Sequence, residues 1–124
     1  MDTKKILLVE DSHIIQLLIQ TVLSDYDCEL RFVNNGEQAL DAIMKEKPDL
    51  LIMDIMMPVM DGFSLLVNID KPFEFPILVV SARADYDSIG RAMELGAHDY
   101  LIKPFNSFNL INKIERLLSL QPKI

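Results

Sequence analysis

Residues 50–62 read Leu-Leu-Ile-Met-Asp-Ile-Met-Met-Pro-Val-Met-Asp-Gly, an apolar run of strand length that ends at Asp54. Further apolar runs of strand length occupy residues 6–9, 30–33, 77–80 and 100–102. Three of the five runs are apolar on both faces, which is typical of strands in the middle of a parallel sheet. The sequence therefore predicts a sheet of five strands in which residues 50–53 form an interior strand.

Helical patterns separate these runs. Strands that alternate with helices predict an α/β domain with a parallel sheet and right-handed crossovers. A serine before an apolar stripe is a common helix N-cap, and a glycine commonly follows the last turn. The first predicted helix covers residues 12–24, with Ser12 as its N-cap. The second follows the turn at residues 34–36 and runs to about Lys47. The others cover residues 62–69, residues 85–95 before Gly96, and a segment after Pro104.

Two expectations concern packing. The apolar stripe of the first helix should cover one face of the sheet. In the loop before residues 77–80, Phe75 should anchor the start of the strand, and Phe73 is expected to be exposed. The stripe comprises Ile15, Leu18, Ile19, Val22 and Leu23.

The length of 124 residues fits one domain, and 50% hydrophobic residues can fill its core. Lys and Arg number 12 against 19 Asp and Glu, a net charge of −7 that argues against binding nucleic acid or an anionic membrane. Cys28 is the single cysteine, which excludes an internal disulfide and favours a reducing compartment. The apolar N-terminal run is too short for a signal peptide or membrane span. We therefore expect a single cytoplasmic domain over residues 1–124.

Polar residues occur where four of the predicted strands end. They are Glu10 and Asp11, Asp54, Ser81, and Lys103. Ligands of open parallel α/β sheets bind at the carboxyl ends of the strands, so these side chains should converge on one edge. The sequence predicts a site there for a hard cation and a phosphoryl group.

Each residue type has a use in such a site. Mg²⁺ takes one or two carboxylates together with water and phosphoryl oxygens, and Asp11 and Asp54 are the expected direct ligands. An aspartate can itself attack a phosphoryl donor, and Asp54 is the expected nucleophile. Lys103 and the Ser81 hydroxyl would stabilise the transferred oxygens. Taken singly, these residues could be helix caps, turn residues or a solvated lysine; their joint placement favours the site.

The chain resembles the receiver domain of bacterial two-component response regulators, from about Lys4 to Leu118. The resemblance implies a flavodoxin-like (βα)5 fold, with five parallel strands in the order 2-1-3-4-5 flanked by five helices. It rests on Leu-Val-Glu10-Asp11-Ser12, on Asp54-Ile-Met-Met-Pro58-Val-Met-Asp-Gly62, on Ser81-Ala, and on Asp-Tyr100-Leu-Ile-Lys103-Pro104-Phe.

The resemblance also implies a metal site. Asp54 would be the phosphoacceptor and a ligand of Mg²⁺ or Mn²⁺. Asp11 would be a direct ligand, Glu10 a ligand through water, and Met56 a ligand through its backbone carbonyl. Pro58 and Gly62 belong to the same motif and would be structural.

The remaining implied roles concern the phosphoryl group and the switch. Lys103 would contact the phosphoryl group, aimed by a cis bond to Pro104. Ser81, which stands where the family more often has threonine, would hydrogen-bond the phosphoryl group. Tyr100 matches an aromatic residue that turns inward when the domain is phosphorylated. The surface of the fourth helix, fifth strand and fifth helix would then change shape and select partners.

The implied function is two-component phosphorelay signalling. The phosphoryl group would come from a phosphohistidine on a sensor histidine kinase or a histidine phosphotransfer protein, and a downstream effector would read the result. The domain would catalyse its own phosphorylation and dephosphorylation without being an enzyme in the usual sense. Residues 85–99 carry a net charge of −3 and residues from 103 onward +3, which would favour a partner of mixed charge or a homodimer through that surface.

Several alternatives stay open. The chain could be a free-standing receiver with no output domain, or the N-terminal receiver of a longer regulator or hybrid kinase. It could also be a scaffold that binds partners without phosphorylation. A phosphatase of the haloacid-dehalogenase type is disfavoured because Met56 stands where a second aspartate is needed. A flavodoxin is disfavoured because Glu10 and Asp11 would repel a flavin phosphate.

Overall fold

A computed structural model describes residues 3–123. Five strands alternate with five helices, as predicted, and most element boundaries lie within two residues of the expected ones. The elements are β1 (Lys4–Val9), α1 (His13–Leu23), β2 (Cys28–Val33), α2 (Gly36–Lys45), β3 (Leu50–Met53), α3 (Gly62–Asn68), β4 (Ile77–Ser81), α4 (Tyr86–Glu94), β5 (Asp99–Ile102) and α5 (Ser107–Leu117).

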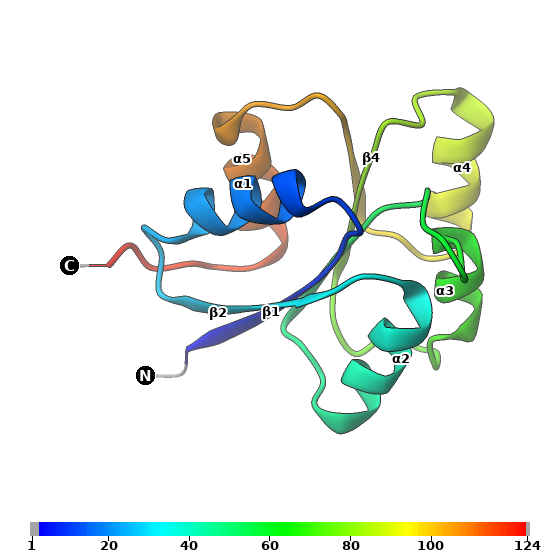
Figure 1. Ribbon diagram of the computed structural model, residues 1–124, viewed down its shortest axis with the longest axis horizontal. Helices are drawn as coiled ribbons and strands as arrows, with labels where there is room; N and C mark the ends of the chain where they lie inside the picture. The colour runs from blue at the N-terminus through cyan, green and yellow to red at the C-terminus, as the bar shows by residue number, and fades with distance from the viewer. Residues whose placement is uncertain (1–2, 124) are drawn as a thin grey trace.

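All four strand pairings are parallel, and the sheet order is β2-β1-β3-β4-β5. This confirms the order 2-1-3-4-5. Figure 1 shows α1 and α5 on one face of the sheet and α2, α3 and α4 on the other. The strand order reverses between β1 and β3, so the carboxyl ends of these two strands border the crevice where such sheets bind ligands.

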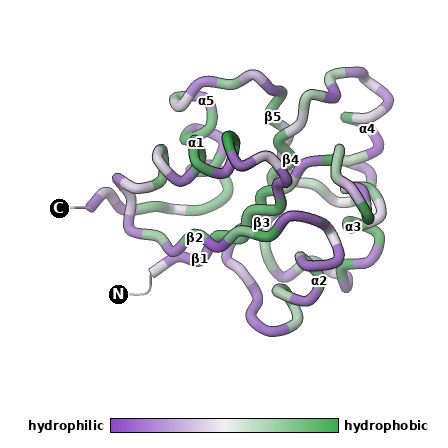
Figure 2. Tube along the Cα trace, in the orientation of Figure 1, coloured by the Kyte–Doolittle hydropathy of each residue, from purple (hydrophilic) through white to green (hydrophobic). Residues whose placement is uncertain are grey.

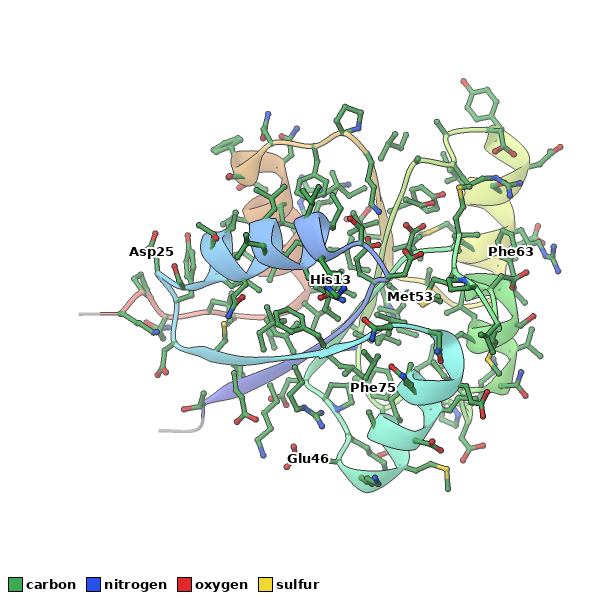
Figure 3. All side chains as sticks on the ribbon, viewed as in Figure 1. His13, Asp25, Glu46, Met53, Phe63 and Phe75 are labelled. Carbon is green, nitrogen blue, oxygen red and sulfur yellow. The ribbon has the colours of Figure 1, made fainter. Side chains whose placement is uncertain are left out.

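The two faces of the sheet form two separate cores. Alternate residues of β1 divide between them: Leu7 and Val9 pack with α2, α3 and α4, while Ile6 and Leu8 pack with α1 and α5. All four are at most 1% exposed. In Figure 2 the hydrophobic colour is concentrated in the central strands, and the hydrophilic colour is concentrated in the surrounding helices and loops. In Figure 3, Met53 of β3 lies at the centre and Phe63 toward the α3 and α4 side. A strand buried on both faces explains its continuous apolar run.

Each helix begins at a polar N-cap whose side chain accepts a hydrogen bond from a main-chain N–H of the first turn. The expectation for Ser12 is confirmed. Because helices start on the side where strands end, these caps fix the loops that carry the polar residues. The caps are Ser12, Asn35, Asp61, Asp85 and Asn106.

Two packing expectations were wrong. Leu18 is 39% exposed, because the buried face of α1 runs through Ile19 and Leu23. Phe73 is half-buried, with its ring against Gly96 and 6.5 Å from the ring centre of His98. Gly96 follows α4 at φ +112°, and a side chain there would overlap the Phe73 ring. Phe75 is 6% exposed and does anchor the start of β4.

Within residues 3–123, no helix has the length and apolar character needed to cross a membrane.

Candidate functional site

Three of the predicted site residues meet at the carboxyl edge of the sheet. Glu10 follows β1, Asp54 follows β3, and Lys103 follows β5. The Lys103 Nζ lies 2.6 Å from Glu10 Oε1 and 2.8 Å from Asp54 Oδ2. The side chains of Glu10 and Asp54 are 3% and 7% exposed, and that of Lys103 is 16% exposed. One partly buried ammonium therefore joins two buried carboxylates that follow different strands.

Burial and ion pairing shift the pKa values of Lys103 and Glu10 in opposite directions. Burial alone would lower the pKa of the Lys103 ammonium, but its hydrogen bonds to Asp54 and Glu10 outweigh burial and raise that pKa. Burial raises the pKa of the Glu10 carboxyl, although Lys103 opposes the change. Lys103 is accordingly held as a cation at neutral pH.

The loop after β3 fixes the Asp54 side chain. Its Oδ1 accepts a hydrogen bond from the Met56 N–H at 2.9 Å, and its own N–H donates to the Val9 carbonyl at 3.2 Å. The Gly62 N–H donates to the Ile55 carbonyl at 2.8 Å and closes the loop. A Cβ on Gly62 would lie 2.6 Å from the Asp54 carbonyl oxygen, so only glycine fits.

Asp11 lies apart from this ion cluster. Its side chain is exposed and lines a cavity of about 490 Å³ together with residues of the β3–α3 loop and Arg83. In the part of the chain that the structure describes, no three His, Cys, Asp or Glu side chains are close enough to hold a metal ion. The other lining residues are Ile55, Met56, Met57, Pro58, Asp61 and Phe63.

Ser81 and Tyr100 meet through the backbone of one residue. Ser81 is fully buried, and its Oγ accepts a hydrogen bond from the Arg83 N–H at 3.2 Å. The Tyr100 hydroxyl donates to the Arg83 carbonyl at 2.6 Å, with the ring pointing inward and 9% exposed. Burial raises the pKa of the Tyr100 hydroxyl. The Lys103 N–H donates to the Ser81 carbonyl at 2.9 Å, and the Lys103–Pro104 peptide bond is cis.

Sequence reasoning missed Gln16 of α1. This side chain is 8% exposed and donates to the Glu10 carbonyl. The spacing from Gln16 to Ile19 and Leu23 places all three on one face of the helix, so a polar residue on the apolar face was a usable signal.

The sequence and the fold have counterparts in known proteins. The probable transcriptional regulator ycf27 of Cyanophora paradoxa is 36% identical over 115 residues, which are 93% of this chain and 48% of that protein. The chain thus spans about half the length of the curated relatives it matches.

Two solved structures are similar over nearly their full length. Chemotaxis protein CheY4 of Vibrio cholerae is 31% identical with a TM-score of 0.85, over 94% of this chain and 100% of that one. The receiver domain of sensor histidine kinase PA1611 from Pseudomonas aeruginosa, with a magnesium ion coordinated in its active site cleft, is 28% identical with a TM-score of 0.82. That match covers 94% of this chain and 98% of the other. The family profile of the response regulator receiver domain matches residues 6–115, and the chain belongs to that family.

Proposed function

We propose that Asp54 accepts a phosphoryl group from a phosphohistidine donor in a Mg²⁺-dependent reaction, and that phosphorylation changes which proteins the domain binds. The observation that carries this proposal is the 2.8 Å contact between Asp54 Oδ2 and the Lys103 ammonium at the ligand-binding edge of the sheet.

The transfer needs a carboxylate nucleophile and a positive charge beside it. An Asp54 carboxylate oxygen forms the bond to phosphorus while the bond from phosphorus to the donor imidazole nitrogen breaks, and that nitrogen keeps the electron pair. Lys103 then shifts from the Asp54 oxygen to an oxygen of the transferred group. Dephosphorylation returns the domain to its first state: water attacks phosphorus, and the Asp54 carboxylate is the leaving group.

The charges in the site fit a divalent cation. Glu10, Asp11 and Asp54 with Lys103 carry a combined charge of −2. Asp11, Asp54 and the Met56 carbonyl would hold Mg²⁺ or Mn²⁺ directly, and Glu10 would do so through water, which is the oxygen ligation that Mg²⁺ prefers. When bound, the ion would neutralise charge on the attacking carboxylate and on the phosphoryl oxygens.

Ser81 and Tyr100 provide the route from the site to the surface. A phosphoryl oxygen on Asp54 would offer the Ser81 hydroxyl a charged acceptor, which is stronger than a neutral one. Because the Arg83 backbone bonds to Ser81 on one side and to Tyr100 on the other, movement of Ser81 would act on the Tyr100 ring. The α4-β5-α5 surface beside that ring would then select a downstream effector or a second copy of the domain.

The donor would approach across α1 and α5. Ile14, Leu17 and Phe108 are 80%, 63% and 71% exposed, an apolar surface on helices that begin at the edge where Asp54 lies. A shallow cavity of about 410 Å³ lies between the two helices and includes Phe108 among its lining residues. A phosphohistidine-bearing helix of a sensor kinase or phosphotransfer protein must bring its imidazole to Asp54, so it would cover this adjoining surface.

The test is phosphorylation by acetyl phosphate with Mg²⁺. We expect one phosphoryl group per chain, lost in Asp54→Asn and retained in Asp61→Asn, which alters an exposed aspartate that lines the cavity beside the site. Labelling that survives Asp54→Asn would overturn the assignment of Asp54.

The half-length match to curated relatives supports a second arrangement. Residues 1–124 would then be the receiver of a longer regulator or hybrid kinase, with the same chemistry at Asp54. A scaffold without phosphorylation predicts instead that Asp54→Ala leaves partner binding unchanged with and without acetyl phosphate.

A further inference from the structure

Gln16 is a buried polar side chain on a helix face that is otherwise apolar. It is 8% exposed, while Ile19 and Leu23 on the same face of α1 are 0% and 2% exposed. Burying an amide without hydrogen bonds is costly, so a glutamine there needs partners that compensate for lost water.

Both hydrogens of the Gln16 amide have partners. Nε2 donates to the Glu10 carbonyl oxygen at 2.5 Å and to Asn34 Oδ1 at 3.0 Å. A main-chain carbonyl can only accept, which fixes which end of the amide faces Glu10. The bond to Glu10 reaches back from the second turn of α1 to the end of β1.

The Glu10 carbonyl belongs to the peptide group that joins Glu10 to Asp11. That peptide group is planar, so a hydrogen bond to its oxygen limits rotation of the whole group. It thereby limits the position of the Asp11 Cα, from which the side chain extends. The rest of Glu10 is also held: its N–H donates to the Val33 carbonyl at 3.0 Å, and its carboxylate accepts from the Ser12 N–H at 3.0 Å. Gln16 supplies the remaining restraint.

The contact extends to a second loop. Asn34 follows β2, and its N–H donates to Gln38 Oε1 at 2.8 Å. Through Asn34 and Gln38, the amide of Gln16 connects the acidic loop after β1 to the first turn of α2. The loop that carries Glu10 and Asp11 is therefore tied to two neighbouring elements by side-chain amides.

We infer that Gln16 is a positioning residue for the cation site: it holds the Glu10–Asp11 peptide group so that Asp11 can bind Mg²⁺. This inference rests on the proposed function. Mg²⁺ requires near-ideal octahedral geometry, and residues that orient metal ligands typically change affinity by about 10- to 100-fold when removed. Since Gln16 acts on a ligand through its main chain, we expect a loss near the lower limit, about tenfold.

The experiment is a Mg²⁺ titration of the full chain followed by amide NMR shifts, without phosphodonor. Gln16→Met keeps the length of the side chain and removes the donor, and Gln20→Met makes the same change one turn later at an exposed position of α1. We expect the Mg²⁺ Kd to rise about tenfold in Gln16→Met and to stay within about twofold in Gln20→Met. Asn34→Ala changes an exposed residue and removes the Asn34 Oδ1 acceptor of the Gln16 amide. We expect it to raise the Mg²⁺ Kd by less than Gln16→Met, and it keeps the test possible if Gln16→Met does not fold.

A second measurement separates positioning from simple loss of stability. At saturating Mg²⁺, Gln16→Met should be phosphorylated by acetyl phosphate at nearly the wild-type rate, because bound Mg²⁺ restores the position of Asp11. An unchanged Kd in both Gln16→Met and Asn34→Ala, or an equal rise in Gln20→Met, would overturn the inference. Absence of Mg²⁺ binding by the wild-type chain would instead overturn the proposed function.

Discussion

Val59 is held in an unfavourable backbone conformation next to the site. Among residues 3–123, Val59 is the non-glycine residue with a positive φ, at 70°, and the residue is 79% exposed. The left-handed region is an outlier for a β-branched residue because Cβ crowds the neighbouring carbonyl. Replacing Val59 by glycine removes that crowding and exposes almost no new apolar surface, so the substitution should stabilise the domain.

The magnitude follows from three terms. Relief of the left-handed conformation contributes about 1–3 kcal/mol. The greater freedom of glycine in the unfolded chain costs about 0.4–1 kcal/mol. Only about a fifth of the Val59 side chain is covered, so its lost burial costs about 0.3–0.6 kcal/mol on the usual scale for a fully buried valine. The limits of the three terms combine to between about −0.6 and +2.3 kcal/mol, and their midpoints give a gain of about 0.9 kcal/mol in the unfolding free energy of Val59→Gly.

Urea unfolding followed by circular dichroism measures this difference. The matched control is Val67→Gly, the same change at a 58% exposed valine inside α3. Lower helix propensity and lost side-chain burial together should cost about 1 kcal/mol there. Val59→Asn should also stabilise, because asparagine tolerates the left-handed region better than valine. If Val59→Gly and Val67→Gly both destabilise by similar amounts, the strain assigned to Val59 does not exist.

Two further substitutions test other parts of the structure. Gly62→Ala should cost about 1–3 kcal/mol in urea unfolding, because the new Cβ would meet the Asp54 carbonyl oxygen and the Ile55 Cα, each at 2.6 Å. Hydrogen bonds from Ser88 hold the pKa of Asp85 below its ordinary 3.8, so the stability that this charge contributes is present above 3.8 and lost as the pH falls through the lowered pKa. The unfolding midpoint of wild type should therefore exceed that of Asp85→Asn at neutral pH, and the two should converge in acid.

The fold was predictable because its signals are local. A strand buried on both faces must be apolar throughout, and residues 50–53 and 77–80 are. The sheet order came from the resemblance, since periodicity does not order strands. Leu18 and Phe73 were misjudged because their burial depends on which neighbour covers them, a tertiary property that helix periodicity and loop composition do not contain.

The site was predictable as a set of residues and less so as a geometry. The rule that parallel strands end at one edge brought Glu10, Asp54 and Lys103 together, and the structure has them within hydrogen-bond distance. The same rule predicted that Asp11 would converge with these three residues. Its side chain is instead exposed and lies apart from the cluster of Glu10, Asp54 and Lys103. Glu10 is buried and the next residue, Asp11, is exposed. The positions of the strands in the sequence do not predict which of two adjacent loop residues points into the site.

Lys103 and the proposed divalent cation would share the same carboxylates, which would limit how the proposed site works. With Lys103 bridging Glu10 and Asp54, the cluster of these three side chains has a net charge of −1, and Asp11 adds a second negative charge at the cavity wall. A divalent cation beside Asp11 would cancel the total without displacing Lys103. A phosphoryl group on Asp54 would then bring new negative charge, and Lys103 can follow it while Glu10 still accepts one of its hydrogens. In the proposed transfer, one hydrogen of the Lys103 ammonium would bind the phosphoryl oxygen while another stays on Glu10. The hydrogen bond to Glu10 would then limit how far Lys103 moves.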